Sequence, residues 1–373
     1  MKSQNLFLAF AIIILSSTTA VLAQEQTGVC DAEGIKTDYE NLTANYKATN
    51  IDALNSALAS AKKVKEICKA STDELLKPQL NFVDRQIVAL QGKILQLQFN
   101  AAASAAMKSK DYAASYTLAK EILTNDARFK NNVDLKIYAA RAAYAASSKA
   151  NGTDPVLLDA IKMMGEAIAQ IEGGAKSTDW GLYDLVYKVT TGDSRDNALA
   201  GLHFTIGELK FEKTGEKAEA VKYFVKATTF PGADKDFIVR GYFNIGTYYG
   251  EFFKKNFDEA NAKYKANGEK DTDETILLYG TAKAYADRAM DAYGRALQVL
   301  GTDDKDAAAS LESTIANFYK FRFDGKTEGQ KEYVATLLAN PMPDPSSEIV
   351  PVKEETPAAP APTVPPTPIK PTN

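Results

Sequence analysis

Apolar side chains recur at intervals of three and four residues along most of this chain, which is the spacing of one face of an α-helix. In the segment 51–70, for example, Leu54, Leu58, Ala61 and Val64 follow this spacing. Signals for β-strands are scarce, so the pattern predicts an all-α protein. The expected helices span 31–48, 51–70, 72–107, 112–123, 133–148, 155–171, 179–189, 195–212, 217–229, 236–253, 257–267, 274–300, 305–323 and 328–338.

Short clusters of turn-forming residues separate these helices, so consecutive helices should pack as antiparallel hairpins. One such turn is expected at 254–256, between the helices 236–253 and 257–267. The segment 274–300 contains no internal turn signal. It forms either one long helix or two.

The N-terminus has the features of a secretory signal peptide, which we assign to residues 1–23. Lys2 precedes an unbroken apolar run at 6–15, and Val21-Leu22-Ala23 offers small residues for cleavage. No second apolar stretch approaches the ~20 residues of a membrane span. We therefore expect an exported protein without a membrane-spanning helix, periplasmic or extracellular.

Export gives a role to the two cysteines, Cys30 and Cys68. Cys30 precedes the first expected helix and Cys68 lies near the end of the second, and an antiparallel pair of similar length returns the chain to its starting point. Disulfides form readily in an oxidising compartment. We predict a Cys30–Cys68 disulfide that fastens the hairpin at about residues 30–70.

Proline divides the mature chain into two parts. Of the 14 prolines, 11 follow Asn340, and proline disrupts the interior of helices and sheets. We therefore expect a helical domain at 24–340 and a disordered, proline-rich tail at 341–373. Such a tail adopts an extended polyproline II conformation and could contact the cell envelope.

Two segments resemble the tetratricopeptide repeat, whose helix pair carries W-x2-L-G-x2-Y and then A-x3-F. The first has Ile206-Gly207 followed by Ala220-x3-Phe224, and the second has Ile245-Gly246 followed by Ala260 and Tyr264. A weaker echo has Tyr144 in the first helix and Ala160-x3-Met164 in the second. The resemblance implies an irregular α-solenoid of stacked hairpins, in which small residues allow close helix packing and a large residue opposite fills the gap.

The resemblance also implies a concave surface formed by the first helix of each pair, where a protein or peptide partner would bind. Transferred onto this chain position by position, the surface would include Phe204, Glu208, Arg240, Phe243, Thr247 and Glu251. The leading functional hypothesis is therefore an exported interaction module. The alternatives are a structural envelope protein tethered through its tail, and a carrier of a small ligand.

Other functions find less support in the residues. Acidic residues outnumber basic ones by 48 to 44, and no basic run suggests nucleic-acid binding. The single histidine, His203, lies among apolar residues, where packing is the expected role. No nucleophile motif or phosphate-binding loop accompanies it. We expect neither enzymatic activity nor a cofactor or metal.

Overall fold

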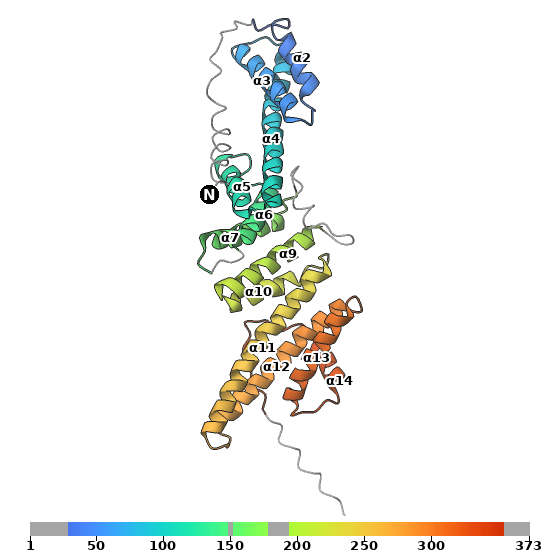
Figure 1. Ribbon diagram of the computed structural model, residues 1–373. Coiled ribbons are helices and arrows are strands. Elements are labelled where there is room, and N and C mark those ends of the chain that lie inside the picture. Colours follow the sequence, from blue (N-terminus) through green and yellow to red (C-terminus); the bar gives the residue numbers. More distant parts are fainter. Residues whose placement is uncertain (1–28, 148–151, 178–193, 354–373) are drawn as a thin grey trace, which may run out of the picture. The chain divides into compact units, whose positions relative to one another are not determined.

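The computed structural model describes residues 29–147, 152–177 and 194–353. The described residues do not include the predicted signal peptide, the expected helix 179–189 or residues 354–373. Twelve α-helices form within it, which confirms the all-α prediction. Their bounds are α2 Lys36–Asn45, α3 Ile51–Ile67, α4 Lys77–Lys108, α5 Tyr112–Asn125, α6 Val133–Ala146, α7 Pro155–Glu172, α9 Ser194–Leu209, α10 Lys217–Ala227, α11 Lys235–Ala266, α12 Asp273–Leu300, α13 Lys305–Arg322 and α14 Gln330–Leu338 (Figure 1).

The chain divides into two compact units after Ala105. In the first unit, α2, α3 and the N-terminal half of α4 share one hydrophobic core. Leu42 of α2, Leu54 of α3 and Leu90 of α4 are at most 2% exposed within it. The Phe82 ring of α4 also packs edge-on against Tyr46 from the end of α2. Burial of one apolar face of each helix therefore holds the unit together.

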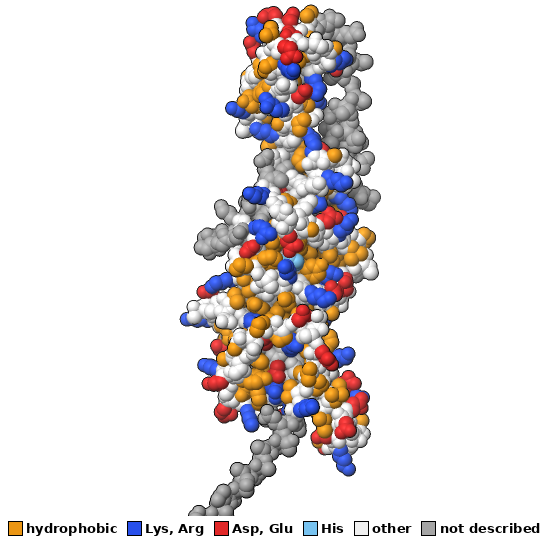
Figure 2. Space-filling model, turned by 180° about the vertical axis from the view of Figure 1, so that it is seen from behind, with side chains coloured by type: hydrophobic (Ala, Val, Ile, Leu, Met, Phe, Trp, Pro, Cys, Tyr) orange, Lys and Arg blue, Asp and Glu red, His pale blue; other side chains and the backbone are white. Residues whose placement is uncertain are grey.

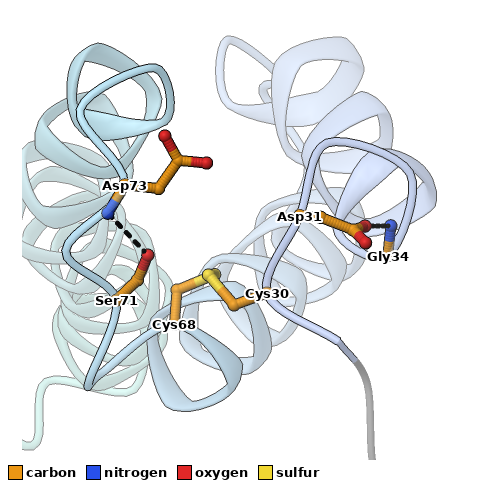
Figure 3. The surroundings of a disulfide bond; sticks show 6 residues. All are labelled: Cys30, Asp31, Gly34, Cys68, Ser71 and Asp73. Atoms are coloured by element: carbon orange, nitrogen blue, oxygen red, sulfur yellow. Dashed lines mark hydrogen bonds between the residues drawn. A yellow bond between two sulfur atoms is a disulfide. The ribbon is translucent and has the colours of Figure 1, made fainter.

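A disulfide joins Cys30 to Cys68, as the sequence predicts (Figure 3). It connects the residues before α2 with the residue that ends α3. Helix α2 begins later than expected because Asp31 accepts a hydrogen bond from the backbone N–H of Gly34 at 2.7 Å and residues 31–35 form turns. Side-chain capping by Asn50, which accepts from Ala53 N–H at 2.8 Å, fixes the start of α3.

The second unit contains the helices from α5 onward, and most of them pack against their neighbours in sequence, whereas α14 packs against α12. Its main core lies among α9 to α14 and is rich in aromatic side chains. Helix α9 continues into one π-helical turn, Lys210–Thr214, which Gly215 ends at a φ of +74°. Sequential hairpins are thus the organising feature, in agreement with the loop pattern in the sequence.

The expected turn at 254–256 is wrong, because α11 runs through it without interruption. The Asn256 side chain donates to the carbonyl of Phe252 at 2.8 Å, inside the helix rather than breaking it. Across the same point, the Phe253 and Phe257 rings stack, and both pack against Phe321 of α13. The polar residues at 254–256 therefore mark the less buried side of one helix.

The actual turn lies after α11, where Gly268 has a φ of +68°. Helix α12 then returns antiparallel alongside α11 (Figure 1). It is one unbroken helix from Asp273 to Leu300, which settles the alternative left open by the sequence. Together, α11 and α12 form the longest hairpin of the described chain.

The start of the proline-rich tail differs from the expectation of disorder. Residues 341–353 form no helix, as their prolines predict, but they pack against α12. The backbone N–H of Val352 donates to the carbonyl of Gly280 at 3.0 Å, and Arg288 donates to the Ser347 hydroxyl at 2.8 Å. The folded region therefore extends at least to residue 353.

Candidate partner-binding surface

Close helix packing in the second unit depends on two glycines. A Cβ at Gly207 of α9 would lie 2.6 Å from the ring of Phe224 on α10, and a Cβ at Gly246 of α11 would lie 2.7 Å from the ring of Tyr293 on α12. In each hairpin, therefore, an aromatic side chain of the second helix fills the space that the glycine leaves.

The second pairing changes how the sequence pattern is interpreted. Tyr293 follows Ala289 by four residues, and both are buried, so the A-x3-aromatic pattern that faces Gly246 lies on α12. The sequence had suggested Ala260 and Tyr264 for this role. Because both of those residues belong to α11 itself, they cannot form the second helix of the pair.

The glycine face of α9 and α11 packs against the following helix, and an ion pair lies on another face. Glu208 of α9 and Arg240 of α11 meet at 2.8 Å, and Asp236 adds a second carboxylate at 3.4 Å from Arg240. The Arg240 guanidinium also lies over the ring of Phe204, 4.4 Å from its centre. The pair thus joins α9 to α11 and lies next to the buried ring of Phe204.

Tyr144 of α6 belongs to the same neighbourhood. Burial raises the pKa of its phenol, and the charges of Glu208 and Arg240 act on it in opposite directions. The side chain is nevertheless 38% exposed. Three first helices, α6, α9 and α11, therefore contribute polar or aromatic groups to one region. Only the weak repeat echo around Tyr144 pointed to this residue from sequence.

Burial also affects the acid of the pair. It raises the pKa of Glu208, although Arg240 opposes the shift both by its charge and by its hydrogen bond. The Glu208 side chain is 28% exposed and that of Arg240 is 47% exposed. The ion pair links α9 to α11, and nearly half of the Arg240 side chain stays exposed.

Phe243 and Thr247 extend the surface along α11, because residues spaced by three and four share a helix face. Phe243 is 47% exposed, and one edge of its ring contacts Tyr293. Thr247 donates its hydroxyl to the Phe243 carbonyl at 3.0 Å. An exposed aromatic ring that is held by a second ring is a suitable contact for an apolar side chain of a partner.

The structure separates the remaining two candidates from this surface. Phe204 is 1% exposed and packs against Phe224 and Phe237, so its side chain lies beyond a partner's reach. Glu251 pairs with Lys217 of α10 at 2.6 Å and lines a different hollow, of about 630 Å³, with Tyr248 and Phe252. We define the first-helix surface as Tyr144, Glu208, Asp236, Arg240, Phe243 and Thr247.

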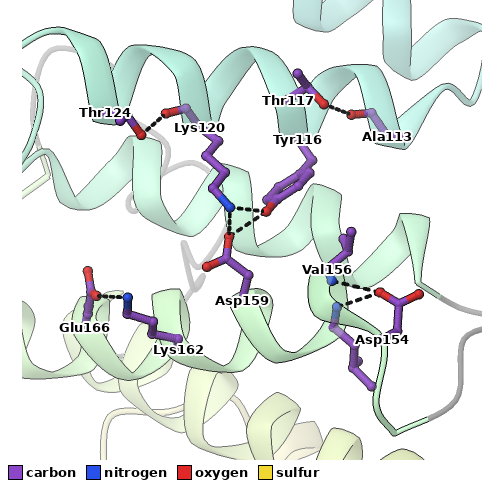
Figure 4. Close-up of polar contacts among 11 residues, drawn as sticks. Ala113, Tyr116, Thr117, Lys120, Thr124, Asp154, Val156, Asp159, Lys162 and Glu166 are labelled. Atoms are coloured by element: carbon purple, nitrogen blue, oxygen red, sulfur yellow. Dashed lines mark hydrogen bonds and ion pairs between the residues drawn. The ribbon is translucent and has the colours of Figure 1, made fainter.

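A polar cluster joins α5 and α7 (Figure 4). The Tyr116 hydroxyl lies 2.5 Å from Asp159 Oδ2, and Lys120 contacts both groups at 2.8 Å. Burial and Asp159 raise the pKa of Tyr116, and the Asp159 and Tyr116 hydrogen bonds raise the pKa of Lys120. The cluster therefore connects α5 to α7 through side-chain contacts.

His203 has a packing role, as predicted. Its ring stacks on Phe230, lies beside Tyr223, and is 8% exposed. Burial, reinforced by the charge of Lys226, lowers its pKa to about 4. Among the described residues, neither ring nitrogen has a hydrogen-bond partner, and the lowered pKa favours the neutral ring at neutral pH.

Charges of both signs are interspersed over the face of the molecule in Figure 2, and apolar side chains show between them. No helix of the described ranges is both long and apolar enough to span a lipid bilayer. Comparison with the models of known protein families gives no match, and neither does comparison with curated proteins.

Proposed function

We propose that this protein is an exported, non-enzymatic interaction module with tetratricopeptide-like helix pairs. The observation that carries the proposal is that α9 and α11 each combine a tightly packed glycine contact with exposed polar or aromatic side chains. On each helix, an aromatic ring of the following helix packs on a glycine, and the first-helix surface lies beside this contact. The disulfide is consistent with an oxidising compartment, and the residues at 1–23 support export.

The chemistry of the surface favours a protein segment as the partner. Phe243 and Tyr144 offer aromatic contact, and Arg240 offers a guanidinium already held near one carboxylate. A peptide that carries an apolar side chain next to an acidic one would use both. Aromatic and arginine side chains are the residues that most often dominate binding energy at protein interfaces.

Affinity capture from the native compartment tests this proposal. We expect Phe243→Ala and Arg240→Ala to reduce the recovery of a co-purifying protein without unfolding the chain. Leu158→Ala on α7 is the matched control, because Leu158 is an apolar side chain that is also 47% exposed but lies outside the first-helix surface. Equal recovery with wild type, Phe243→Ala and Leu158→Ala would argue against the surface.

An envelope protein tethered by its tail is the second candidate, and one observation favours it. Residues 341–353 are fastened to α12 by backbone and side-chain hydrogen bonds, so a load on the chain beyond Lys353 would be transmitted to the folded unit. Deletion of 354–373 should then move the protein from the insoluble envelope fraction to the soluble fraction. Unchanged fractionation would count against tethering and leave the interaction surface as proposed.

A further inference from the structure

A hollow of about 630 Å³ lies between the start of α10 and the middle of α11, apart from the first-helix surface. Two aromatic side chains, Tyr248 and Phe252, form its apolar wall, and their rings meet edge-on with centres 4.9 Å apart. The rest of the lining comes from residues 215–219 and from Glu251 and Lys255 of α11. The volume is within the ~300–1,000 Å³ range of ligand sites.

The charged groups of this lining favour a ligand with acceptors or negative charge. Lys255 is exposed and forms no ion pair with any residue that the structure describes. Its ammonium group offers three hydrogen-bond donors and no acceptor. The carboxylates of the lining, by contrast, each lie within 2.7 Å of a lysine, in the pairs Glu251–Lys217, Glu219–Lys222 and Glu216–Lys210.

Residues 354–373 have the complementary chemistry. They contain seven prolines, and Glu354 and Glu355 are their only charged side chains before Lys370. Proline has a backbone carbonyl but no N–H, so a proline-rich segment presents more acceptors than donors. Aromatic-lined grooves are the usual binding sites of such segments. The prolines thus match the aromatic wall, and the two glutamates match Lys255.

The position of Val352 places this segment within reach of the hollow. The Val352 N–H donates to the carbonyl of Gly280 at 3.0 Å, and Tyr285 lies about 7.5 Å further along α12 at 1.5 Å per residue. The Tyr285 ring stacks on Phe252, with centres 5.3 Å apart. With side-chain lengths included, the hollow lies on the order of 20 Å from Val352. Residues 354–373 would span about 60 Å as polyproline II at ~3.1 Å per residue.

We propose that residues 360–368 of this same chain bind in the hollow, with their prolines against Phe252 and with Glu354 and Glu355 near Lys255. The proline-rich segment is then an intramolecular ligand rather than only a spacer. A proline-rich peptide from another protein would meet the same wall and would have to displace it. This site is independent of the first-helix surface.

Photo-cross-linking in the full exported chain tests the assignment. A benzophenone amino acid at position 364 should form cross-links within the same molecule to residues 215–219 or 248–255, which mass spectrometry locates. Covalent dimers would show that the segment binds a second copy, and cross-links confined to other parts of the chain would show that it lies elsewhere. Either result would overturn the proposal, as would the absence of any cross-link.

Two variants identify the contacts. Lys255→Glu replaces the unpaired cation by a charge that repels the two glutamates, and Phe252→Ala removes the aromatic wall, so each should lower the cross-link yield severalfold. Lys265→Glu is the matched control, because Lys265 is also an exposed lysine of α11 but lies outside the hollow. If Phe252→Ala does not fold, as judged by circular dichroism, Lys255→Glu still provides the test at an exposed position. Equal yields in Lys255→Glu, Lys265→Glu and the wild type would contradict the assignment.

Discussion

The packing of Gly246 against Tyr293 is the contact that distinguishes the observed hairpin from the one expected from sequence. A Cβ at position 246 would lie 2.7 Å from two ring carbons of Tyr293. Ordinary carbon contacts are about 3.5–4.0 Å. For Gly246→Ala, the ring or one helix must therefore move by roughly 1 Å, and overpacking of this kind costs about 1–3 kcal/mol.

Gly165 on α7 is the matched control for the same exchange. It also lies inside a helix, but a Cβ there meets nothing within 4 Å. Gly165→Ala should therefore gain up to ~1 kcal/mol from helix propensity, with no steric cost. We expect Gly246→Ala to be about 1–3 kcal/mol less stable than Gly165→Ala.

A double-mutant cycle identifies the residue that Gly246 faces. Tyr293→Leu makes room for the new methyl group, so its combination with Gly246→Ala should show a coupling of about 0.5–3 kcal/mol. Tyr264→Leu should show none, because Tyr264 lies roughly 27 Å further along α11 at 1.5 Å per residue. Hydrogen exchange of the α11 and α12 amides measures the local free energy of opening. Coupling to Tyr264 instead of Tyr293 would refute the α11–α12 hairpin.

Three further predictions concern other parts of the chain. Replacing Cys30 and Cys68 by Ser should lower the stability of the first unit by about 4 kcal/mol, the value that the chain-entropy model gives for a 38-residue separation. Hydrogen exchange in α2 and α3 measures this loss, and unchanged protection of their amides would contradict the prediction. The folded-state pKa of His203 is depressed from 6.5 to about 4, so its contribution to stability should be fully present above pH 6.5 and should fall by about 3 kcal/mol as the pH drops towards 4. In His203→Phe, the free energy of unfolding in urea should depend less on pH over that window, and an unchanged pH dependence would count against the buried neutral ring. Gly280→Ala would place a Cβ 2.5 Å from the Val352 carbonyl oxygen, so hydrogen exchange of the Val352 amide should be faster in this variant than in the wild type. Equal exchange rates in the two proteins would show that residues 341–353 are not held against α12 at this point.

Much of the fold could be predicted from sequence because local signals and packing agree there. Pro155 lies at the start of α7, and Asp154 caps it by accepting from the N–H of Val156 at 2.8 Å. Asn50 and Asp111 act as helix caps in the same way. The cysteine pairing was predicted from two helices of similar length; α2 has 10 residues and α3 has 17, and the turn residues before α2 make up part of the difference. In each case, the information lies within a few residues or within one hairpin.

The errors arise where distant residues decide the local structure. Lys254-Lys255-Asn256 resembles a turn as an isolated tripeptide, yet Phe321 of α13 packs on both Phe253 and Phe257 and thereby favours a continuous helix. The segment 341–353 is a similar case. Its prolines correctly exclude a helix, but they give no information about Gly280, whose missing side chain allows the Val352 carbonyl to approach α12. Sixty or more residues separate these partners in sequence.

The candidate site shows the same limit and indicates how a composite surface arises. Glu208 and Arg240 were found from repeat positions, and the structure brings them together. Tyr144 was not assigned to the surface because its proximity to Glu208 and Arg240 depends on tertiary packing. Asp236 was missed although it lies four residues before Arg240 on α11, a spacing that the sequence shows. Phe204 was included because periodicity cannot tell which neighbouring helix covers a given face. The surface is therefore a property of the stacked hairpins, and a substitution that disturbs glycine packing, such as Gly207→Ala, should weaken partner capture even though Gly207 lies outside the surface.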